Sequence, residues 1–267
     1  MPGSTKSYTE EQALSPTDPP DWFPDEHPPG PPIILHAKGV AWACGSCHLM
    51  SGLGHPEHAD LTGLTAEYLI QQVRDYKSGA RKDGAQRMNE IVGPLSDEDI
   101  RQSSEWFAKL KPRVWTRVTE VTTVPRTYTR DTRMRFVHPD GGTEPLGNRI
   151  VTLPVDAFRS RNRDPHSGYV TYVPVGSVAK GEALVKSGSC AVCHGDALEG
   201  IANVPRIGGI HALYVVRQLR DFQTGARNGK DAALMKKAVA KLSDEDIVAI
   251  AAYLAAQPPP TASGDSR

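Results

Sequence analysis

The sequence of 267 residues has few aromatic residues, no excess of charge and no long apolar run. Lysine plus arginine and aspartate plus glutamate each number 31, which argues against a protein held to nucleic acid by its net charge. No stretch approaches the roughly 18 consecutive apolar residues that a transmembrane helix needs, so we expect no membrane span. Aromatic residues make up only 6% of the chain, which is little for a core of this size, and we expect another group to fill the interior.

Cysteine is also scarce, and its four residues form two pairs of identical spacing, each followed directly by a histidine. C-x-x-C-H is the attachment signature of c-type haem, because two thiols at this spacing reach the two vinyl groups on one edge of the porphyrin. The next residue then lies under the ring, where its imidazole can bind the iron. We therefore predict two covalently bound haem c groups, attached at Cys44, Cys47 and His48 and at Cys190, Cys193 and His194.

Three other uses of paired cysteines fit the sequence less well. A thioredoxin-like dithiol needs a βαβ context, which neither pair has. A zinc site would have to use adjacent Cys and His residues, which chelate poorly in a tetrahedron, from pairs that lie 146 residues apart. Structural disulfides usually close loops longer than two residues. Covalent haem therefore remains the prediction.

An offset of 146 residues relates more than the cysteines, so the chain contains an internal repeat. Residues 68–81 match residues 214–227, and both segments have the apolar spacing of an amphipathic helix. Each of these helices is predicted to end at a glycine, Gly79 or Gly225.

A second matched pair of segments predicts the last helix of each repeat. After one inserted residue, 95–100 matches 242–247, and both read Leu-Ser-Asp-Glu-Asp-Ile. Serine is a good N-cap and the acids suit the positive end of a helix, so both segments predict a helix start. Shorter helices are expected before the two haem motifs, over 33–43 and 178–186.

The ligand on the other side of each iron is predicted to be a methionine. Met88 lies 40 residues after the first haem-motif histidine and Met235 lies 41 after the second, and of the five methionines only these two are in register. A thioether ligand favours the reduced iron and raises its potential, whereas the alternative role is core packing. His55 and His58 are rival ligands for the first haem, but the second repeat has no counterpart, and we expect surface residues.

These motifs resemble those of tandem di-haem class I cytochromes c, which many bacteria keep in the periplasm. The resemblance covers residues 33–112 and 178–257. It implies a mainly α fold with two cytochrome c domains, His/Met low-spin haems and electron transfer as the function. In that family a proline soon after the haem motif lends its carbonyl to the ligand histidine. Pro205 matches this role, whereas the first repeat has Ala59 there, which leaves the orientation of the His48 ring open.

Two arginines in register are further candidates for contact with the haems. Arg81 and Arg227 each follow the glycine that ends the first matched helix. They could pair with haem propionates. They could equally be ordinary cations at a helix end, where the helix dipole favours positive charge. The sequence leaves this choice open.

Three segments lie outside the repeats. Residues 1–32 are rich in proline and acids, but Trp22 and Phe23 are costly to leave in water, so we expect an extended arm on a protein surface rather than a solvated tail. Residues 113–177 are too long for a plain linker. Residues 258–267 are expected to form a flexible tail.

The segment 113–177, which we call the connector, is predicted to contain short strands. Alternating β-branched and aromatic residues favour strands near 114–124, 149–154 and 169–173. Ten arginines against six acids give the connector a net charge of +4 between residues 112 and 178. It fits either a clamp that holds the two haem units or a docking face for a redox partner.

The main functional hypothesis is an electron carrier, not an enzyme, that links a dehydrogenase donor to a cytochrome or oxidase acceptor of a respiratory chain. The chain could also be the cytochrome subunit of a dehydrogenase complex. The alternative is a di-haem peroxidase or another haem enzyme with an iron site that can open, but two in-register methionines argue against it. Residues 1–18 lack the features of a signal peptide, and because c-type haem is attached outside the cytoplasmic membrane we expect a periplasmic protein whose signal has been removed.

Overall fold

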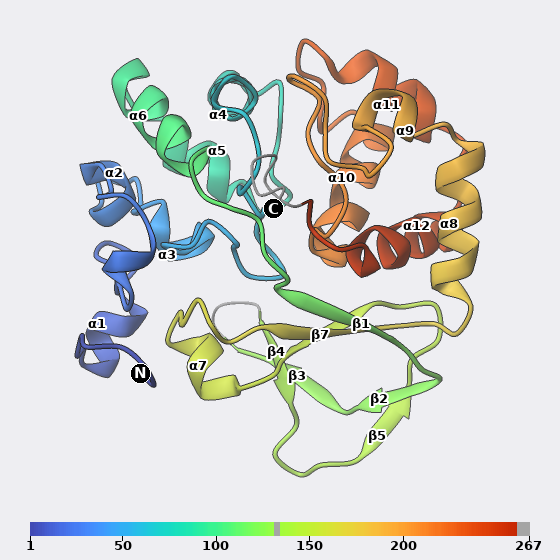
Figure 1. Cartoon of the computed structure of the whole chain (residues 1–267), viewed down its shortest axis with the longest axis horizontal. Helices are drawn as coiled ribbons and strands as arrows, with labels where there is room; N and C mark the ends of the chain where they lie inside the picture. Colours follow the sequence, from blue (N-terminus) through green and yellow to red (C-terminus); the bar gives the residue numbers. More distant parts are fainter. Residues whose placement is uncertain (131–133, 261–267) are drawn as a thin grey trace, which may run out of the picture.

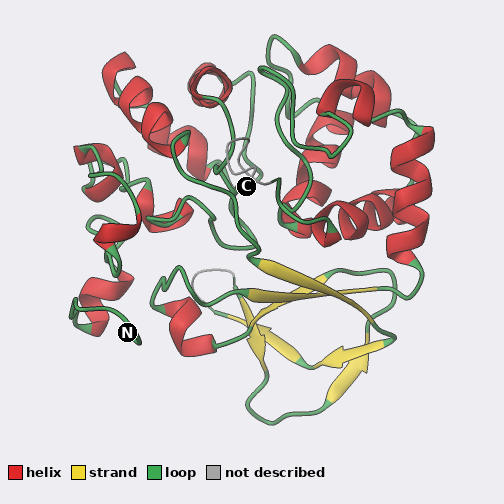
Figure 2. Ribbon diagram, in the orientation of Figure 1, coloured by secondary structure: helices red, strands yellow, loops and turns green. Residues whose placement is uncertain are grey.

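The computed structural model describes residues 1–130 and 134–260. Its helices form two groups side by side, and the strands gather beneath them in a separate layer (Figure 1, Figure 2). We call residues 33–112 the first unit, residues 178–257 the second unit and residues 1–32 the arm. Among the described residues, no helix is both long and apolar enough to cross a membrane.

In the first unit the long helix α4 ends, and the last helix α6 begins, where the sequence predicts. Thr65 caps the long helix α4 by accepting a hydrogen bond from the backbone of Tyr68, and Gly79 ends it with a left-handed φ of 78°. Ser96 forms a capping box with Asp99 at the start of the last helix. The helices are α2 (Pro32–Leu35), α3 (Gly45–His48), α4 (Ala66–Ser78), α5 (Arg87–Val92) and α6 (Asp97–Phe107).

The second unit repeats this arrangement with a more complete first helix. Gly225 ends its long helix with a φ of 77°, and Ser243 forms the capping box of its last helix with Asp246. One continuous apolar core surrounds α10 and α12. The helices are α8 (Ser177–Ser187), α9 (Ala191–His194), α10 (Ala212–Thr224), α11 (Ala232–Val239) and α12 (Asp244–Ala256).

One predicted helix is wrong. Residues 33–43 form only the short helix α2, which ends at Leu35. The chain then turns at Gly39, whose φ is +63°, and Lys38 bridges to Ala41 across this turn. The corresponding prediction over 178–186 is confirmed by α8, so the two repeats differ just before their haem motifs.

The connector forms a larger β structure than expected. The predicted strand over 114–124 is split in two, the predictions at 149–154 and 169–173 are confirmed, and the other three strands and the helix were not predicted. β7 lies between a parallel β1 and an antiparallel β6, and β2–β5 and β3–β4 form two small antiparallel pairs. The elements are β1 (Thr116–Glu120), β2 (Thr123–Pro125), β3 (Thr127–Thr129), β4 (Arg135–Val137), β5 (Thr143–Pro145), β6 (Val151–Pro154), α7 (Ala157–Arg161) and β7 (Tyr169–Val173).

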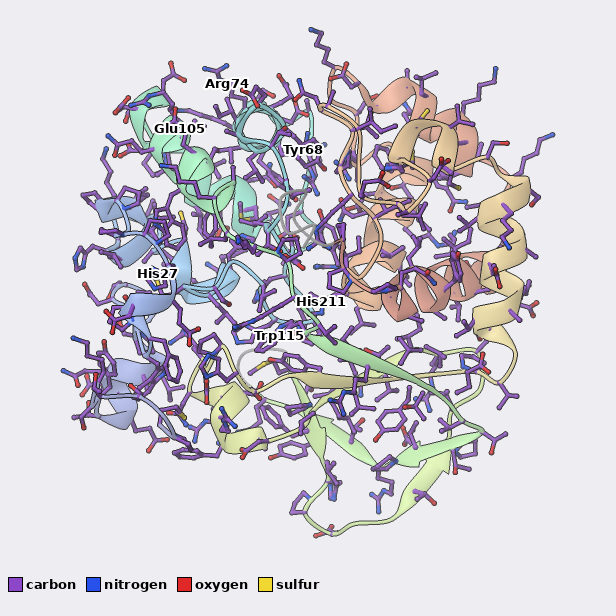
Figure 3. The ribbon with its side chains drawn as sticks, in the orientation of Figure 1. His27, Tyr68, Arg74, Glu105, Trp115 and His211 are labelled. Carbon is purple, nitrogen blue, oxygen red and sulfur yellow. The ribbon has the colours of Figure 1, made fainter. Side chains whose placement is uncertain are left out.

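The connector contacts both units. Trp115 donates its indole N–H to the carbonyl of Gly54 in the first unit at 2.8 Å, and it packs edge-on against Tyr169. His211 of the second unit lies near the same place, with its Nε2 3.0 Å from the carbonyl of Leu53 (Figure 3). Val118 and Ile150 pack against the core of the second unit. The connector therefore touches both units, and its role as clamp or docking face stays a prediction.

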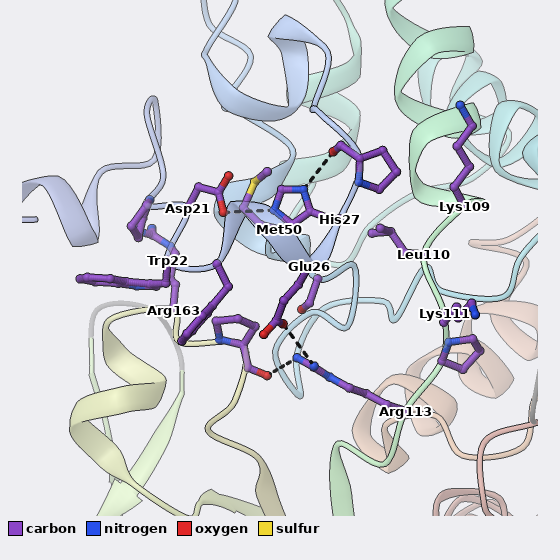
Figure 4. Close-up of a pocket in the computed structure, with 16 residues that line it drawn as sticks. Asp21, Trp22, Glu26, His27, Met50, Lys109, Leu110, Lys111, Arg113 and Arg163 are labelled. Carbon is purple, nitrogen blue, oxygen red and sulfur yellow. Dashed lines mark hydrogen bonds and ion pairs between the residues drawn. The ribbon is translucent and has the colours of Figure 1, made fainter. Parts of the chain in front are cut away.

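The arm lies against the first unit and the connector. It contains α1 (Glu10–Leu14) and a 3-10 turn, η1 (Pro24–Glu26). Trp22 is buried and donates its indole N–H to the carbonyl of Asn162 at 2.7 Å. A cavity of about 300 Å³ lies where arm, first unit and connector meet, and His27 on its wall is 3.1 Å from Asp21 Oδ1 (Figure 4). Of the predicted flexible tail, residues 261–267 lie outside the described residues.

Candidate haem-binding sites

Both haem-motif histidines are held in the same way. His48 and His194 each end a single helical turn, α3 or α9, that starts after the first cysteine of the motif. The Nδ1 of His48 lies 2.9 Å from the carbonyl of Ala59, and the Nδ1 of His194 lies 2.7 Å from that of Pro205. A carbonyl can only accept, so Nδ1 is the protonated nitrogen and Nε2 keeps its lone pair for a metal.

The orientation of the His48 ring, which the sequence left open, is therefore fixed by Ala59. The interaction uses a backbone carbonyl, so the first unit does not need a proline at this position. Burial lowers the pKa of both His48 and His194, which keeps the rings neutral, as metal binding requires. The two histidines fit a haem iron.

The cysteines do not fit the other uses considered for them. No two of them form a disulfide with each other. Burial raises the pKa of Cys44 to about 12 and also raises the pKa of Cys47 and Cys190, whereas a redox dithiol needs a thiolate. Within residues 1–130 and 134–260, no group of three or more His, Cys, Asp or Glu residues could hold a metal ion.

Each predicted methionine ligand lies in the same apolar cluster as the first cysteine of its haem motif. Met88, on α5, and Cys44 pack against one cluster, and Met235, on α11, and Cys190 pack against the other. Both side chains are half-buried rather than sealed in the core. This placement is compatible with a sixth ligand, and the ligation itself stays a prediction.

The expectation that His55 and His58 are surface residues is wrong. His55 is only 6% exposed, His58 is half-buried, and their rings lie 5.6 Å apart between centroids. The His58 ring is in turn 6.4 Å from that of His48. The connector and the second unit cover this part of the first unit, and burial lowers the pKa of His55 to about 3. Sequence proximity to the motif could not reveal that cover.

Arg81 and Arg227 lie at the contact between the two units in a nearly twofold arrangement. Arg81 donates to Gln72 of its own unit at 2.9 Å and to the Tyr214 hydroxyl of the other at 3.1 Å. Likewise, Arg227 donates to Gln218 of its own unit at 3.0 Å and to the Tyr68 hydroxyl of the first unit at 2.6 Å. Tyr68 points into the space between the helical groups (Figure 3). The two arginine backbones form an antiparallel bridge as well.

These contacts bear on the roles predicted for the arginines. Arg81 is 3% exposed, so it is not an ordinary solvated cation at a helix end. Its Nε is buried without a hydrogen-bond partner, which suits an acceptor such as a propionate carboxylate. The propionate role itself stays a prediction. Sequence reasoning missed the glutamine and tyrosine partners, although their register in the repeat was a signal that could have found them.

Comparison with known proteins identifies the family. The sequence profile named Cytochrome c matches residues 178–257. Cytochrome c-554(548) of Halomonas halodenitrificans is 41% identical over 83 residues, which cover 98% of that protein and 31% of this chain. The chain belongs to the cytochrome c family. It is a tandem class I cytochrome c with two covalently bound haem c groups, similar along most of its length to di-haem relatives.

The similarity to two-domain cytochromes extends over both units. Cytochrome c4 of Pseudomonas aeruginosa is 29% identical over 239 residues, 83% of this chain and 90% of that protein. The thiosulfate dehydrogenase electron acceptor of Thiomonas intermedia is 26% identical over 243 residues, 86% of each chain. The crystal structure of reduced cytochrome c4 from Pseudomonas stutzeri superimposes with a TM-score of 0.53 at 25% identity, over 80% of this cytochrome and 93% of that chain. The cytochrome is thus an electron-transfer protein.

Proposed function

We propose that this cytochrome carries electrons in the periplasm from a dehydrogenase to a cytochrome or oxidase of a respiratory chain. The main support for the proposal is that the two haem-motif histidines have the same hydrogen-bonding arrangement. Their Nδ1 atoms lie 2.9 Å and 2.7 Å from backbone carbonyls. A relative described as an electron acceptor of thiosulfate dehydrogenase supports a dehydrogenase as the donor class. Haem attachment through C-x-x-C-H motifs supports the periplasmic location.

The protein groups that hold each haem are assigned from the motifs and their surroundings. When bound, each haem supplies an iron that is reversibly oxidised and reduced by one electron. The carbonyls of Ala59 and Pro205 fix the tautomer and direction of the ligand imidazoles. Thioether links are assigned to Cys44, Cys47, Cys190 and Cys193, iron ligands to His48, Met88, His194 and Met235, and propionate contacts to Arg81 and Arg227.

The chain's own residues are suited to keeping the iron environment constant between the two redox states. Buried imidazoles with lowered pKa values stay neutral. Methionine thioethers favour the reduced iron. A fixed ligand set needs little rearrangement on electron transfer. A haem enzyme would instead need one ligand to leave.

Electron exchange with protein partners is assigned to the second unit. Ser46, inside the first haem motif, is 4% exposed, and Arg163 of the connector donates to its carbonyl. Val192, at the equivalent motif position, is 78% exposed, and Cys193 beside it is exposed. Val192→Asp should therefore slow reduction by a protein donor, whereas Val175→Asp, at a 66% exposed connector residue, should not. Equal rates for the two variants would contradict this assignment.

The cofactor content is tested by the mass of the denatured protein. Thioether bonds survive unfolding, so the mass should exceed that of the chain by two haems. A mass that fits one haem or none would refute the proposed function. A free thiol at any of the four cysteines, detected by its reaction with an alkylating reagent, would refute it as well.

The choice between carrier and enzyme is tested by the oxidised protein at rest. Both irons should be six-coordinate and low-spin, peroxide turnover should be negligible, and small reductants should reduce both haems reversibly. A high-spin signal from the first haem, together with peroxide consumption that depends on it, would place the protein among the di-haem peroxidases instead.

A further inference from the structure

The carbonyls of Ala59 and Pro205 accept the hydrogen bonds of the haem-motif histidines, and a charged residue follows each of them in the chain. The two charged side chains meet between the units. Asp60 follows Ala59 in the first unit, and Arg206 follows Pro205 in the second. Nη2 of Arg206 forms an ion pair with Oδ2 of Asp60. The two side chains are 0% and 3% exposed, so solvent hardly screens this pair.

The ion pair is fully hydrogen-bonded by its surroundings. Oδ1 of Asp60 accepts from the backbone N–H of Thr62 at 2.9 Å and from its hydroxyl at 2.7 Å. Arg206 donates from Nε to the carbonyl of Thr62 at 2.7 Å and from Nη1 to that of Gly208 at 2.9 Å. Both side chains therefore have fixed positions, and each backbone segment next to them is held in place.

These contacts connect the two histidines through the interior. The path runs from His48 Nδ1 to the Ala59 carbonyl, along the chain to Asp60, across the ion pair to Arg206, and back through the Pro205 carbonyl to His194 Nδ1. The offset of 146 residues relates Ala59 to Pro205 and Asp60 to Arg206. The repeat thus places opposite charges at equivalent positions.

Stability alone does not explain a charged pair at this place. Taking two charges out of water is costly, and apolar residues of similar volume often hold an interface as well or better. A buried charge near an iron ligand has a further effect, because an anion favours the more positive oxidised iron and a cation favours the reduced iron. Side by side, Asp60 and Arg206 cancel these effects.

We propose that Asp60 and Arg206 are positioning residues that set the reduction potentials of both irons together, by fixing the carbonyls that hold His48 and His194 and by balancing each other's charge. The inference rests on the proposed function, since it requires both histidines to bind iron. Loss of either charge should leave the other one buried and unbalanced. Both potentials should then move in the same direction, set by the sign of the remaining charge.

The experiment compares the midpoint potentials of both haems in the intact holoprotein at pH 8, by spectroelectrochemical titration. Asp60→Asn should raise both potentials, Arg206→Gln should lower both, and the double variant should return them toward the parent values. Arg206→Lys, which keeps the charge, should shift them less than Arg206→Gln. Arg217→Gln is the matched control, because Arg217 also reaches from the second unit to the first, at the carbonyl of Glu57, but is exposed to solvent.

A merely structural pair would give another pattern. Asp60→Asn and Arg206→Gln would then shift the potentials in the same direction or not at all, and the double variant would be no nearer to the parent than the single ones. Either result overturns the inference, as does a shift of equal size in Arg217→Gln. Should Asp60→Asn fail to fold, the comparison of Arg206→Gln with Arg206→Lys decides. A parent without two low-spin, reducible haems would refute the proposed function itself, before any variant is compared.

Discussion

Replacing Gly181 by alanine should destabilise the second unit, because α8 and α12 approach each other backbone to backbone at this residue. A Cβ at Gly181 would lie 2.0 Å from the carbonyl oxygen of Ala249, 2.6 Å from its carbonyl carbon and 2.7 Å from Cβ of Tyr253. Backbone atoms in the middle of a helix cannot move aside as the end of a flexible side chain does. The two helices would therefore have to separate.

The size of this effect follows from two opposing contributions. Overpacking of a well-packed core costs about 1–3 kcal/mol, and the upper end applies here because the obstacle is backbone. Alanine in place of glycine stabilises a helix interior by about 1 kcal/mol. The free energy of unfolding should therefore fall by about 2 kcal/mol. Because α8 leads directly into the second haem motif, the far-red absorption from Met235 should weaken as well.

Equilibrium unfolding in guanidinium chloride, followed by circular dichroism and by haem absorption, measures both effects. Gly84→Ala is the matched control, since an added Cβ there has no atom within 4 Å and the residue needs no positive φ. That variant should keep the stability of the parent to within about 0.5 kcal/mol. Equal stability of Gly181→Ala and Gly84→Ala would refute the close approach of α8 and α12.

Three further changes test the ligands, the connector and the arm. Met88→Ala and Met235→Ala should each abolish the far-red absorption of one oxidised haem and lower its reduction potential. A variant that keeps the spectrum of the parent would show that the iron ligand is another residue. For the first haem, His58→Ala would then be the next variant to test. Arg163→Gln should lower the free energy of unfolding by about 3 kcal/mol and speed proteolysis of the arm, because Arg163 donates hydrogen bonds to the carbonyls of Ala13, Leu14 and Ser46. The control is Arg161→Gln, which loses only an exposed ion pair with Glu10 and should lower the free energy of unfolding by less than about 1 kcal/mol. Equal losses in the two variants would contradict this reasoning. Burial opposes the charged form of His27, but its hydrogen bond to Asp21 raises its pKa above 6.5 on balance, so its contribution to stability is complete below pH 6.5 and is lost as the pH rises through the raised pKa. His27→Gln should remove that pH dependence, and an unchanged stability profile would show that the Asp21 contact contributes nothing.

Much of the two units could be predicted because their determinants are local in sequence. A few residues predict each of two serine-capped helix starts and two glycine helix ends. The structure has these starts at α6 and α12 and these ends at α4 and α10. The haem motifs are equally local. The error at 33–43 has a local cause too, since Gly39 interrupts an apolar segment that otherwise resembles a helix.

Contacts between distant segments could not be predicted in this way. The parallel pairing of β1 with β7 places Thr116 beside Tyr169, and the sequence of neither strand indicates which strand it pairs with. β3, β4 and β5 are three residues long, too short for an alternating pattern to be visible. The burial of His55 depends on the connector and the second unit, which lie far along the chain. Repeat register is the one signal that reaches across such distances.

The arm and the connector make the surroundings of the two haem motifs unequal. Both segments pack on the first unit, where Arg163 of the connector donates to the carbonyl of Ser46 within the first haem motif at 2.9 Å. Its guanidinium meets backbone carbonyls there rather than a carboxylate. Exclusion of water and a partly buried cation both favour the reduced iron. The arm and the connector therefore add an asymmetry between the haems of this cytochrome to the one that the repeat already carries, where Ala59 and Asp60 correspond to Pro205 and Arg206.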